Sequence, residues 1–273
     1  MNEMYFCPLY SGSSGNALFC QYGGTRVLID AGKSGSCIEE ALRSIGVDIR
    51  TLDGVLITHE HSDHISGAGV MARKYGLPLY ATEDTWWAMN DKIGKVPEAL
   101  KRVIHANQGF YLGEIGVDPF PIPHDAADPV GYRLYGGALS IATATDLGHF
   151  SREVYDRIRG SNLVLLESNH DPDMLRANPR YNAQLKRRIL GDHGHLSNED
   201  CSKALISLIA AGTGNVILGH LSGENNTPEL AEQVSVSAME NEGIRPGTDV
   251  QLRVALRDKV GAVYTIQRLE QNG

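Results

Sequence analysis

Short apolar runs that each end in an acid or a histidine alternate along the chain with longer stretches of helical spacing. Four such runs are residues 26–30, 54–59, 162–167 and 215–220. Runs of four to eight residues with this boundary predict buried strands. Helices are predicted between them from apolar periodicity and from start and stop signals, at residues 38–45, 66–74, 181–190, 198–211 and 227–239.

The middle and the end of the chain predict further strands. Residues 110–141 are rich in glycine, proline and β-branched residues with several turn signals, which indicates a strand meander. Another strand is predicted at 78–81, and two final strands flank 257–259. Because strands and helices alternate without a repeat or an obvious linker, we expect one mixed α/β domain over residues 1–273.

Composition limits the class of protein. The chain has 273 residues, 42% of them hydrophobic and 21% charged, as in ordinary globular proteins. It has neither an apolar stretch near the roughly 20 residues of a membrane span nor an N-terminal secretory pattern. The four scattered cysteines favour a reducing, cytoplasmic location without membrane contact. The net charge of -8 argues against a broad nucleic-acid-binding surface, yet residues 176–188 hold five basic residues and no acid.

The densest cluster of potential metal ligands is the segment Thr58-His59-Glu60-His61-Ser62-Asp63-His64. Imidazole nitrogen and carboxylate oxygen are ligands that divalent transition metals prefer. Residues two apart in extended backbone point the same way, so His59 and His61 can converge on one ion. Asp63 and His64, beyond the strand end, can turn to a second ion. Other predicted strands also deliver Asp, Glu or His near their ends: Asp30, His124, Asp146, Glu167 and His220.

These motifs, in this order and spacing, resemble those of the metallo-β-lactamase fold superfamily from about residue 5 to about residue 225. The resemblance implies a four-layer αββα sandwich that holds two divalent metal ions, zinc or manganese, between its sheets. The implied ligands are His59, His61 and His124 for one ion, and Asp63, His64 and His220 for the other. Asp146 would bridge the ions, and Asp30 would orient the histidine loop without touching metal.

Further segments narrow the resemblance. They are Ser11–Asn16, Pro123–Ala126, Glu167–Asp171, Gly194–Asn198 and Leu218–Ser222. Together they are similar to the YycJ family, also called WalJ or VicX, which is related to the nucleic-acid-processing branch that includes tRNase Z. The resemblance implies metal-dependent 5′-to-3′ exonuclease activity on double-stranded DNA and a link to mismatch repair. It also implies three catalytic residues: Asp63, and a relay in which Glu167 orients His195 as the general acid.

Small and basic residues near these motifs are candidates for substrate contact. The loop that contains Ser13 and Asn16 can present donors to an anion, and a simple hairpin turn is an equal interpretation. Arg187 and Arg188 are expected to hold phosphates, with a solvated helix face as the alternative. Asn198, which follows the proposed acid, is a further candidate.

Two other activities fit the same ligand set. One is an RNA-processing nuclease of the tRNase Z type, although the chain has no long arm like that of tRNase Z, and the residues themselves do not separate DNA from RNA. The other is a glyoxalase II-like thioester hydrolase. The Gly-His-Leu-Ser-Asn segment and its basic neighbour argue against the thioesterase, because a small thioester needs neither. A non-catalytic metal-binding protein is disfavoured because no ligand of the motif set is missing.

Overall fold

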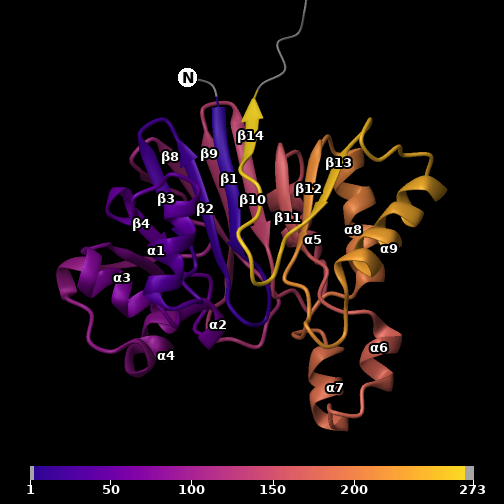
Figure 1. Cartoon of the computed structure of the whole chain (residues 1–273), viewed down its shortest axis with the longest axis horizontal. Helices are drawn as coiled ribbons and strands as arrows, with labels where there is room; N and C mark the ends of the chain where they lie inside the picture. The colour runs from indigo at the N-terminus through magenta and orange to yellow at the C-terminus, as the bar shows by residue number, and fades with distance from the viewer. Residues whose placement is uncertain (1–2, 268–273) are drawn as a thin grey trace, which may run out of the picture.

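Two stacked β-sheets form the centre of the molecule, with helices on both outer faces (Figure 1). The computed structural model describes residues 3–267. In this part of the chain each sheet has seven strands, in the orders β14-β1-β2-β3-β4-β5-β6 and β13-β12-β11-β10-β9-β8-β7. The predicted αββα sandwich is therefore confirmed.

The strands of the two sheets come from separate parts of the chain, except that the last strand, β14, belongs to the first sheet. The first sheet contains β1 (Glu3–Tyr10), β2 (Ala17–Tyr22), β3 (Thr25–Ile29), β4 (Gly54–Leu56), β5 (Leu79–Thr82), β6 (Lys101–Ile104) and β14 (Tyr264–Gln267). The second contains β7 (Phe110–Leu112), β8 (Ile115–Pro121), β9 (Val130–Gly136), β10 (Leu139–Ala144), β11 (Leu163–Glu167), β12 (Asn215–Gly219) and β13 (Gln251–Val254). The predicted meander is β7 to β10, an antiparallel series.

Both sheets also contain a parallel series, β3 to β6 in the first and β10 to β13 in the second. Parallel neighbours need long crossover connections, which here contain helices. The first sheet is covered by α1 (Gly35–Ser44), α3 (Ala68–Tyr75) and α4 (Glu83–Ile93), and the second by α5 (Arg152–Ile158), α8 (Asn198–Ala210) and α9 (Pro228–Asn241) (Figure 1). The other helices are α2 (Ser62–Ile65), α6 (Pro172–Ala177), α7 (Ala183–Ile189) and the 3-10 turns Ile49–Thr51 and Glu98–Leu100.

The five predicted helices are all present, and local capping explains their starts. The Ser197 hydroxyl accepts a hydrogen bond from the Asp200 N–H at the start of α8. Thr227 caps α9 in the same way, with Pro228 in the first turn. Helices α2, α4, α5 and α6 and strands β1 and β2 were not predicted. The acidic first turn of α4 is a helix start signal that was overlooked.

The core has three layers of apolar side chains, one under each helical layer and one between the sheets. The middle layer takes side chains from both sheets, for example Phe6 and Ile29 from the first and Leu134, Ile141 and Leu165 from the second. Because neither sheet can bury this face without the other, the shared layer supports our proposal of a single domain. No helix within residues 3–267 is both long and apolar enough for a membrane span.

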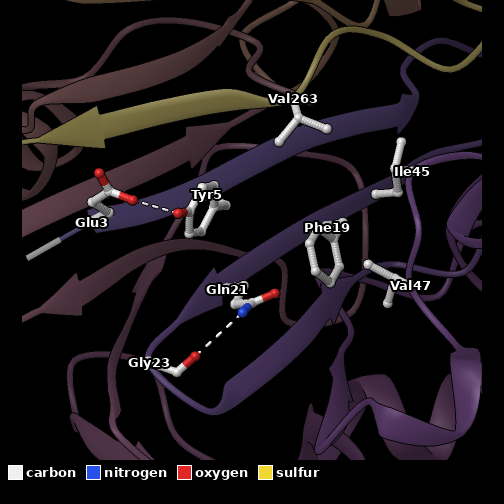
Figure 2. Close-up of a pocket in the computed structure, with 8 residues that line it drawn as sticks. All are labelled: Glu3, Tyr5, Phe19, Gln21, Gly23, Ile45, Val47 and Val263. Carbon is white, nitrogen blue, oxygen red and sulfur yellow. Dashed lines mark hydrogen bonds between the residues drawn. The ribbon is translucent and has the colours of Figure 1, made fainter. Parts of the chain in front are cut away.

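A hollow of about 390 Å³ lies on the first sheet near the start of β1 (Figure 2). Its lining is Glu3, Tyr5, Phe19, Gln21, Gly23, Ile45, Val47 and Val263. The Tyr5 hydroxyl donates to Glu3, and Gln21 Nε2 donates to the Gly23 carbonyl at 3.2 Å, so these polar groups already have partners. The predicted metal ligands lie at the other end of the strands, beyond the ends of β3, β4, β10 and β12, so the candidate site is there and not at the hollow.

Candidate metal centre

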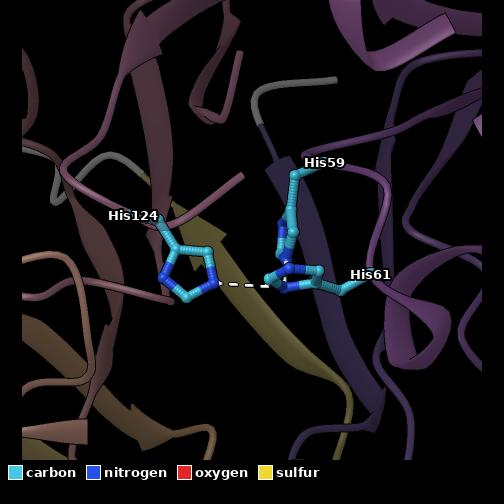
Figure 3. Close-up of side chains that lie close together, drawn as sticks. All are labelled: His59, His61 and His124. Carbon is cyan, nitrogen blue, oxygen red and sulfur yellow. Dashed lines mark hydrogen bonds between the residues drawn. The ribbon is translucent and has the colours of Figure 1, made fainter. Parts of the chain in front are cut away.

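The histidine loop, residues 58–64, follows β4 and runs into the short helix α2, and its first two ligands are His59 and His61. His59 Nε2 lies 3.0 Å from His61 Nδ1, and His61 Nδ1 lies 3.3 Å from His124 Nε2 (Figure 3). Bonds of 2.0–2.1 Å to a tetrahedral metal place ligand atoms roughly 3.3–3.5 Å apart. The spacing of these three side chains is close to that of ligands of one ion.

A second group lies beside the first. Asp63 Oδ2 is 3.5 Å from His64 Nε2 and 3.7 Å from His220 Nε2. Asp146 lies between the two groups, since its oxygens are 3.3 Å from His64 Nε2, 3.6 Å from His220 Nε2 and 3.7 Å from His124 Nε2. All seven predicted ligands are thus brought together, with Asp146 in the position expected of a bridge.

The chemistry of this cluster suits divalent metal ions. Asp146 Oδ2 and His220 Nε2 are buried and have no hydrogen-bond partner, an arrangement that is costly unless another ligand satisfies them. Burial holds the pKa of His59 well below its usual range, so its ring is neutral and free to ligate. Burial acts to lower the pKa of His64 too, but Asp30 and Asp146 raise it well above its usual range. The carboxylates therefore favour positive charge at this place.

The Asp30 carboxylate holds the histidine loop in place through hydrogen bonds. One of its oxygens is 2.7 Å from His64 Nδ1, and the other accepts a hydrogen bond from the Thr58 N–H at 2.8 Å. With Nδ1 of His64 engaged in this way, Nε2 is left to face the other ligands. The position matches the predicted orienting role.

Three residues of the site have left-handed backbone: Asp30 at φ 62°, Asp146 at φ 60° and His220 at φ 56°. Each follows the end of a strand, where the turn aims the side chain along the edge of the sheets. A non-glycine residue in this region costs on the order of 1–3 kcal/mol and persists only where surrounding contacts enforce it. Strain is therefore concentrated at the residues that define the site.

Glu167, at the end of β11, joins two histidines. Its Oε1 accepts hydrogen bonds from Nδ1 of His195 at 2.9 Å and from Nδ1 of His220 at 2.8 Å. Oε2 accepts from the backbone N–H groups of Leu147 and Leu196. Burial acts to raise the pKa of Glu167, but His195 and His220 outweigh it and lower the pKa to about 2. The carboxylate therefore stays ionised and holds both rings with Nε2 free.

The loop that carries His195 is tied to the first ligand group. The Gly194 carbonyl is 3.2 Å from His124 Nδ1, and the His195 N–H donates to the Ile189 carbonyl at 2.9 Å. His195 is 23% exposed, so its ring borders both the ligand cluster and solvent. Burial acts to lower its pKa, but Glu167 raises it, which favours the protonated ring.

The predicted substrate-binding residues fall into two classes. Ser13, Arg187 and Arg188 are exposed, and Arg188 forms an ion pair with Asp125, the residue after His124. Helices α6 and α7, which contain most of the basic segment, extend beyond the ends of the strands (Figure 1). Their basic side chains are therefore open to a large ligand.

Asn16 and Asn198 are buried, and their amide groups are used by the protein. Asn16 Oδ1 accepts from the Gly12 N–H at 2.9 Å, and its Nδ2 is 3.0 Å from His64 Nε2. Asn198 pairs with Asn226 and accepts from the Ser168 hydroxyl. This burial is at odds with the predicted substrate contact, so we reassign both residues to holding the loops of the site in place.

Three supporting residues were missed at the sequence level. Thr58 links Asp30 to the histidine loop, Asp125 holds Arg188, and Asn169 Nδ2 donates to the His220 carbonyl at 2.9 Å. Asp125 and Asn169 both lie within motifs that were recognised. Their partners are distant in sequence, and no local pattern identifies them.

Known proteins with similar sequences or folds agree with this geometry. A family described as the β-lactamase superfamily domain matches residues 25–221. The exodeoxyribonuclease YycJ of Bacillus anthracis is 41% identical over 244 residues, covering 89% of this chain and 92% of that protein. The exodeoxyribonuclease WalJ of Streptococcus pneumoniae is 41% identical over 246 residues, covering 89% of this chain and 91% of that protein.

A solved structure, the metallo-β-lactamase fold protein YhfI from Bacillus subtilis, covers 97% of this chain with a TM-score of 0.71 and 16% identity. At that identity it supports the fold alone. The family match and the two relatives extend over most of the sequence, and the family match includes the segments that carry the clustered histidines and carboxylates. The chain therefore belongs to the β-lactamase superfamily of metal-dependent hydrolases, in the family that contains the exodeoxyribonucleases YycJ and WalJ.

Proposed function

We propose that this hydrolase binds two divalent metal ions, zinc or manganese, and removes nucleotides from double-stranded DNA in the 5′-to-3′ direction. One structural observation carries the proposal. A single oxygen of Glu167 holds both His220, in the ligand cluster, and His195, at its open edge. This arrangement supports the assignment of His195 as a proton donor beside the metal centre, and the names of the two relatives support DNA as the substrate.

The proposed ligands are the seven that the structure brings together: His59, His61 and His124 in one group, Asp63, His64 and His220 in the other, and Asp146 between them. Bound divalent ions would acidify water near the scissile bond and offset the charge that develops on the phosphoryl group. Asp63 is 24% exposed, so it can also accept a hydrogen bond from the attacking water.

His195 supplies the proton for the leaving oxygen in this proposal. Its Nδ1 donates to Glu167, so Nε2 is the atom that gives up a proton to the departing group. Glu167 fixes the tautomer and orientation of the ring and stabilises its positive charge before transfer. Arg187 and Arg188, with Ser13 on the facing loop, hold phosphates that flank the scissile bond.

The experiment is a digest of end-labelled duplex DNA with Mn²⁺ and, separately, with Zn²⁺, by wild type and by Asp146→Ala. Stepwise release of nucleotides from the 5′ end by the wild type alone is the expected result. Lanes with single-stranded DNA and RNA separate the exonuclease from an RNA-processing enzyme. A metal-loaded protein that cleaves no nucleic acid but hydrolyses a thioester would overturn the proposal.

We also propose a cytoplasmic location. The four cysteines are free, with Cys7, Cys20 and Cys201 buried and Cys37 exposed. Unpaired cysteines are typical of a reducing compartment. Fractionation of cells under conditions that preserve thiols tests the location directly, and recovery of the protein outside the cytoplasm would contradict it.

A further inference from the structure

A second group of basic residues, far from the α6–α7 segment in sequence, lies at another border of the metal centre. The connection between β13 and β14 runs beside the loop that joins β1 and β2 (Figure 1). Arg257 comes from this connection, and its side chain lies against Gly12 and Gly223. A Cβ at Gly12 would be 2.5 Å from Arg257 Cγ, and a Cβ at Gly223 would be 1.5 Å from its guanidinium. Only glycine at both positions allows this placement.

Lys33 lies beside Arg257 and shares its partner. Asp258 accepts from Arg257 Nε at 2.7 Å and from Lys33 Nζ at 3.1 Å. The Ser14 hydroxyl also donates to Asp258 at 2.7 Å. These contacts hold two cations and one carboxylate together at the serine- and glycine-rich loop, so one positive charge remains.

This group is connected to the metal ligands by short backbone contacts. Gly12 pairs with Leu221, the residue after His220, and the His220 N–H donates to the Ser11 hydroxyl at 3.0 Å. On the other side, the Asn16 N–H donates to the Asp63 carbonyl at 2.7 Å. The basic group is therefore next to the ligand group of Asp63 and His220, whereas Arg188 borders His124 through Asp125.

We propose that Arg257 and Lys33, with the exposed Ser13–Ser14 loop, form a subsite for a phosphate group of the substrate strand next to the scissile bond. This inference rests on the proposed nuclease function and assigns a second phosphate contact, on the side of the site opposite Arg188. The ligand is a phosphate, either the monoester at the 5′ end or an internal diester.

The free donors of Arg257 carry the argument. Asp258 takes only Nε, and within residues 3–267 the two terminal nitrogens donate to no protein acceptor. A guanidinium held at one nitrogen presents its remaining N–H groups in a planar fork that matches two phosphate oxygens. The Arg257 and Asp258 side chains are 42% and 45% exposed. Exposed ion pairs contribute little to stability, so a purely structural purpose explains the arrangement poorly.

The test compares Arg257→Gln and Lys33→Gln with a matched control, Arg245→Gln. Arg245 also pairs with an aspartate on the surface, Asp249, but it precedes β13, at the end of the parallel strands away from the metal centre. Each variant is assayed on duplexes with a 5′-phosphate and with a 5′-hydroxyl, over a series of salt concentrations. Metal content and circular dichroism verify that each variant is folded and loaded.

The expected result is a rise in KM for DNA of about fivefold to tenfold in Arg257→Gln, larger than the change in kcat. The slope of log affinity against log salt should fall by about 1 per lost contact. Arg257→Lys, which keeps the charge without the fork, should recover part of the loss. A rise confined to the 5′-phosphorylated duplex assigns the subsite to the terminal phosphate, and an equal rise on both duplexes assigns it to an internal phosphate.

An unchanged KM and salt slope in both Arg257→Gln and Lys33→Gln would overturn the subsite, as would an equal effect in Arg245→Gln. Hydrolysis of bis(p-nitrophenyl) phosphate by the wild type separates this failure from that of the proposed function. If the wild type cleaves that small diester and DNA while the variants behave like wild type, only the subsite is wrong. If the wild type cleaves no phosphodiester, the nuclease proposal itself fails.

Discussion

The metal centre and the basic residues that border it are built on opposite physical principles. In the centre, His59 and His64 are fully buried, Asp146 is 2% exposed, and the backbone is strained at three positions. We call the border the basic rim and define it as Lys33, Arg180, Lys186, Arg187, Arg188 and Arg257. Most of these cations are exposed, and among the described residues five of them, all except Arg187, pair with an acid or a backbone carbonyl.

The difference shows where precision is needed. Buried ligands interact in low dielectric and depend on one another, so the loss of one disturbs all the others. Exposed charges are screened by salt and act almost independently, so each loss should be small and additive. A metal-dependent nuclease needs exact geometry at the scissile bond, whereas it has to tolerate variable sequence along the strand.

The strongest test of the centre as a unit is Asp146→Ala. Asp146 contacts both ligand groups, so its removal should eliminate metal occupancy and lower nuclease activity by more than about 10⁴-fold. Metal analysis of the purified variant and a duplex digest measure the two effects. Asp156→Ala, at an exposed position of α5, is the control and should behave as wild type. Retention of both metals by Asp146→Ala would contradict the bridging position.

His195→Ala separates proton donation from metal binding. The side chain lies outside the two ligand groups, so we expect full metal content and a loss of kcat of about 10²- to 10⁴-fold. Substitution of the exposed His105 by alanine is the matched control. Normal turnover in His195→Ala would show that another group protonates the leaving oxygen. A loss of metal would instead make His195 a ligand, as its closeness to Asp146 and His220 permits.

Asp30→Asn tests how far metal binding depends on the contact between the Asp30 carboxylate and His64. The substitution removes the negative charge beside His64 Nδ1, and metal affinity should fall about 10- to 100-fold. Activity should return when metal is supplied in excess. Asp118→Asn, whose partner Arg157 lies away from the site, controls for loss of an acidic side chain. An unchanged affinity would confine Asp30 to a role in folding.

The basic rim should give the smallest effects. Arg187→Gln should raise KM for duplex DNA about threefold, with metal content unchanged. The slope of log affinity against log salt concentration should fall in magnitude by about 1. The double variant with Arg188→Gln should approach the product of the single effects, although Arg188→Gln also frees Asp125. Arg152→Gln, on α5, is the matched control. A large loss of kcat in Arg187→Gln would place Arg187 in the metal centre and contradict the distinction between the centre and the basic rim.

The accuracy of the sequence-based prediction follows the same division. The helices with clear periodicity and caps, such as α8 and α9, were predicted because their signals are local. Helix α4 and the first two strands were missed, since no strong period or flanking motif was used for them. Among site residues, the histidine loop was the easiest to find, because four of its ligands lie within six residues and share one short stretch of backbone.

The assignments of Asn16 and Asn198 show what a local pattern omits. Both occur in motifs near the site, yet each side chain faces inward and its amide group forms hydrogen bonds with neighbouring loops. Whether a polar side chain near a site faces substrate or protein depends on which distant segment packs against it. Sequence spacing carries no information on that point.

The sequence by itself determined the alternation of strands and helices around the site motifs, the chemical type of the ligands and the family to which they point, because periodicity, capping and motif spacing are local properties. Only the tertiary structure decided that one Glu167 oxygen serves both His195 and His220, and that Arg257 lies over Gly12 and Gly223 beside Lys33. Those contacts join residues far apart in the chain. They form only when the two sheets pack together and bring the strand ends to one edge.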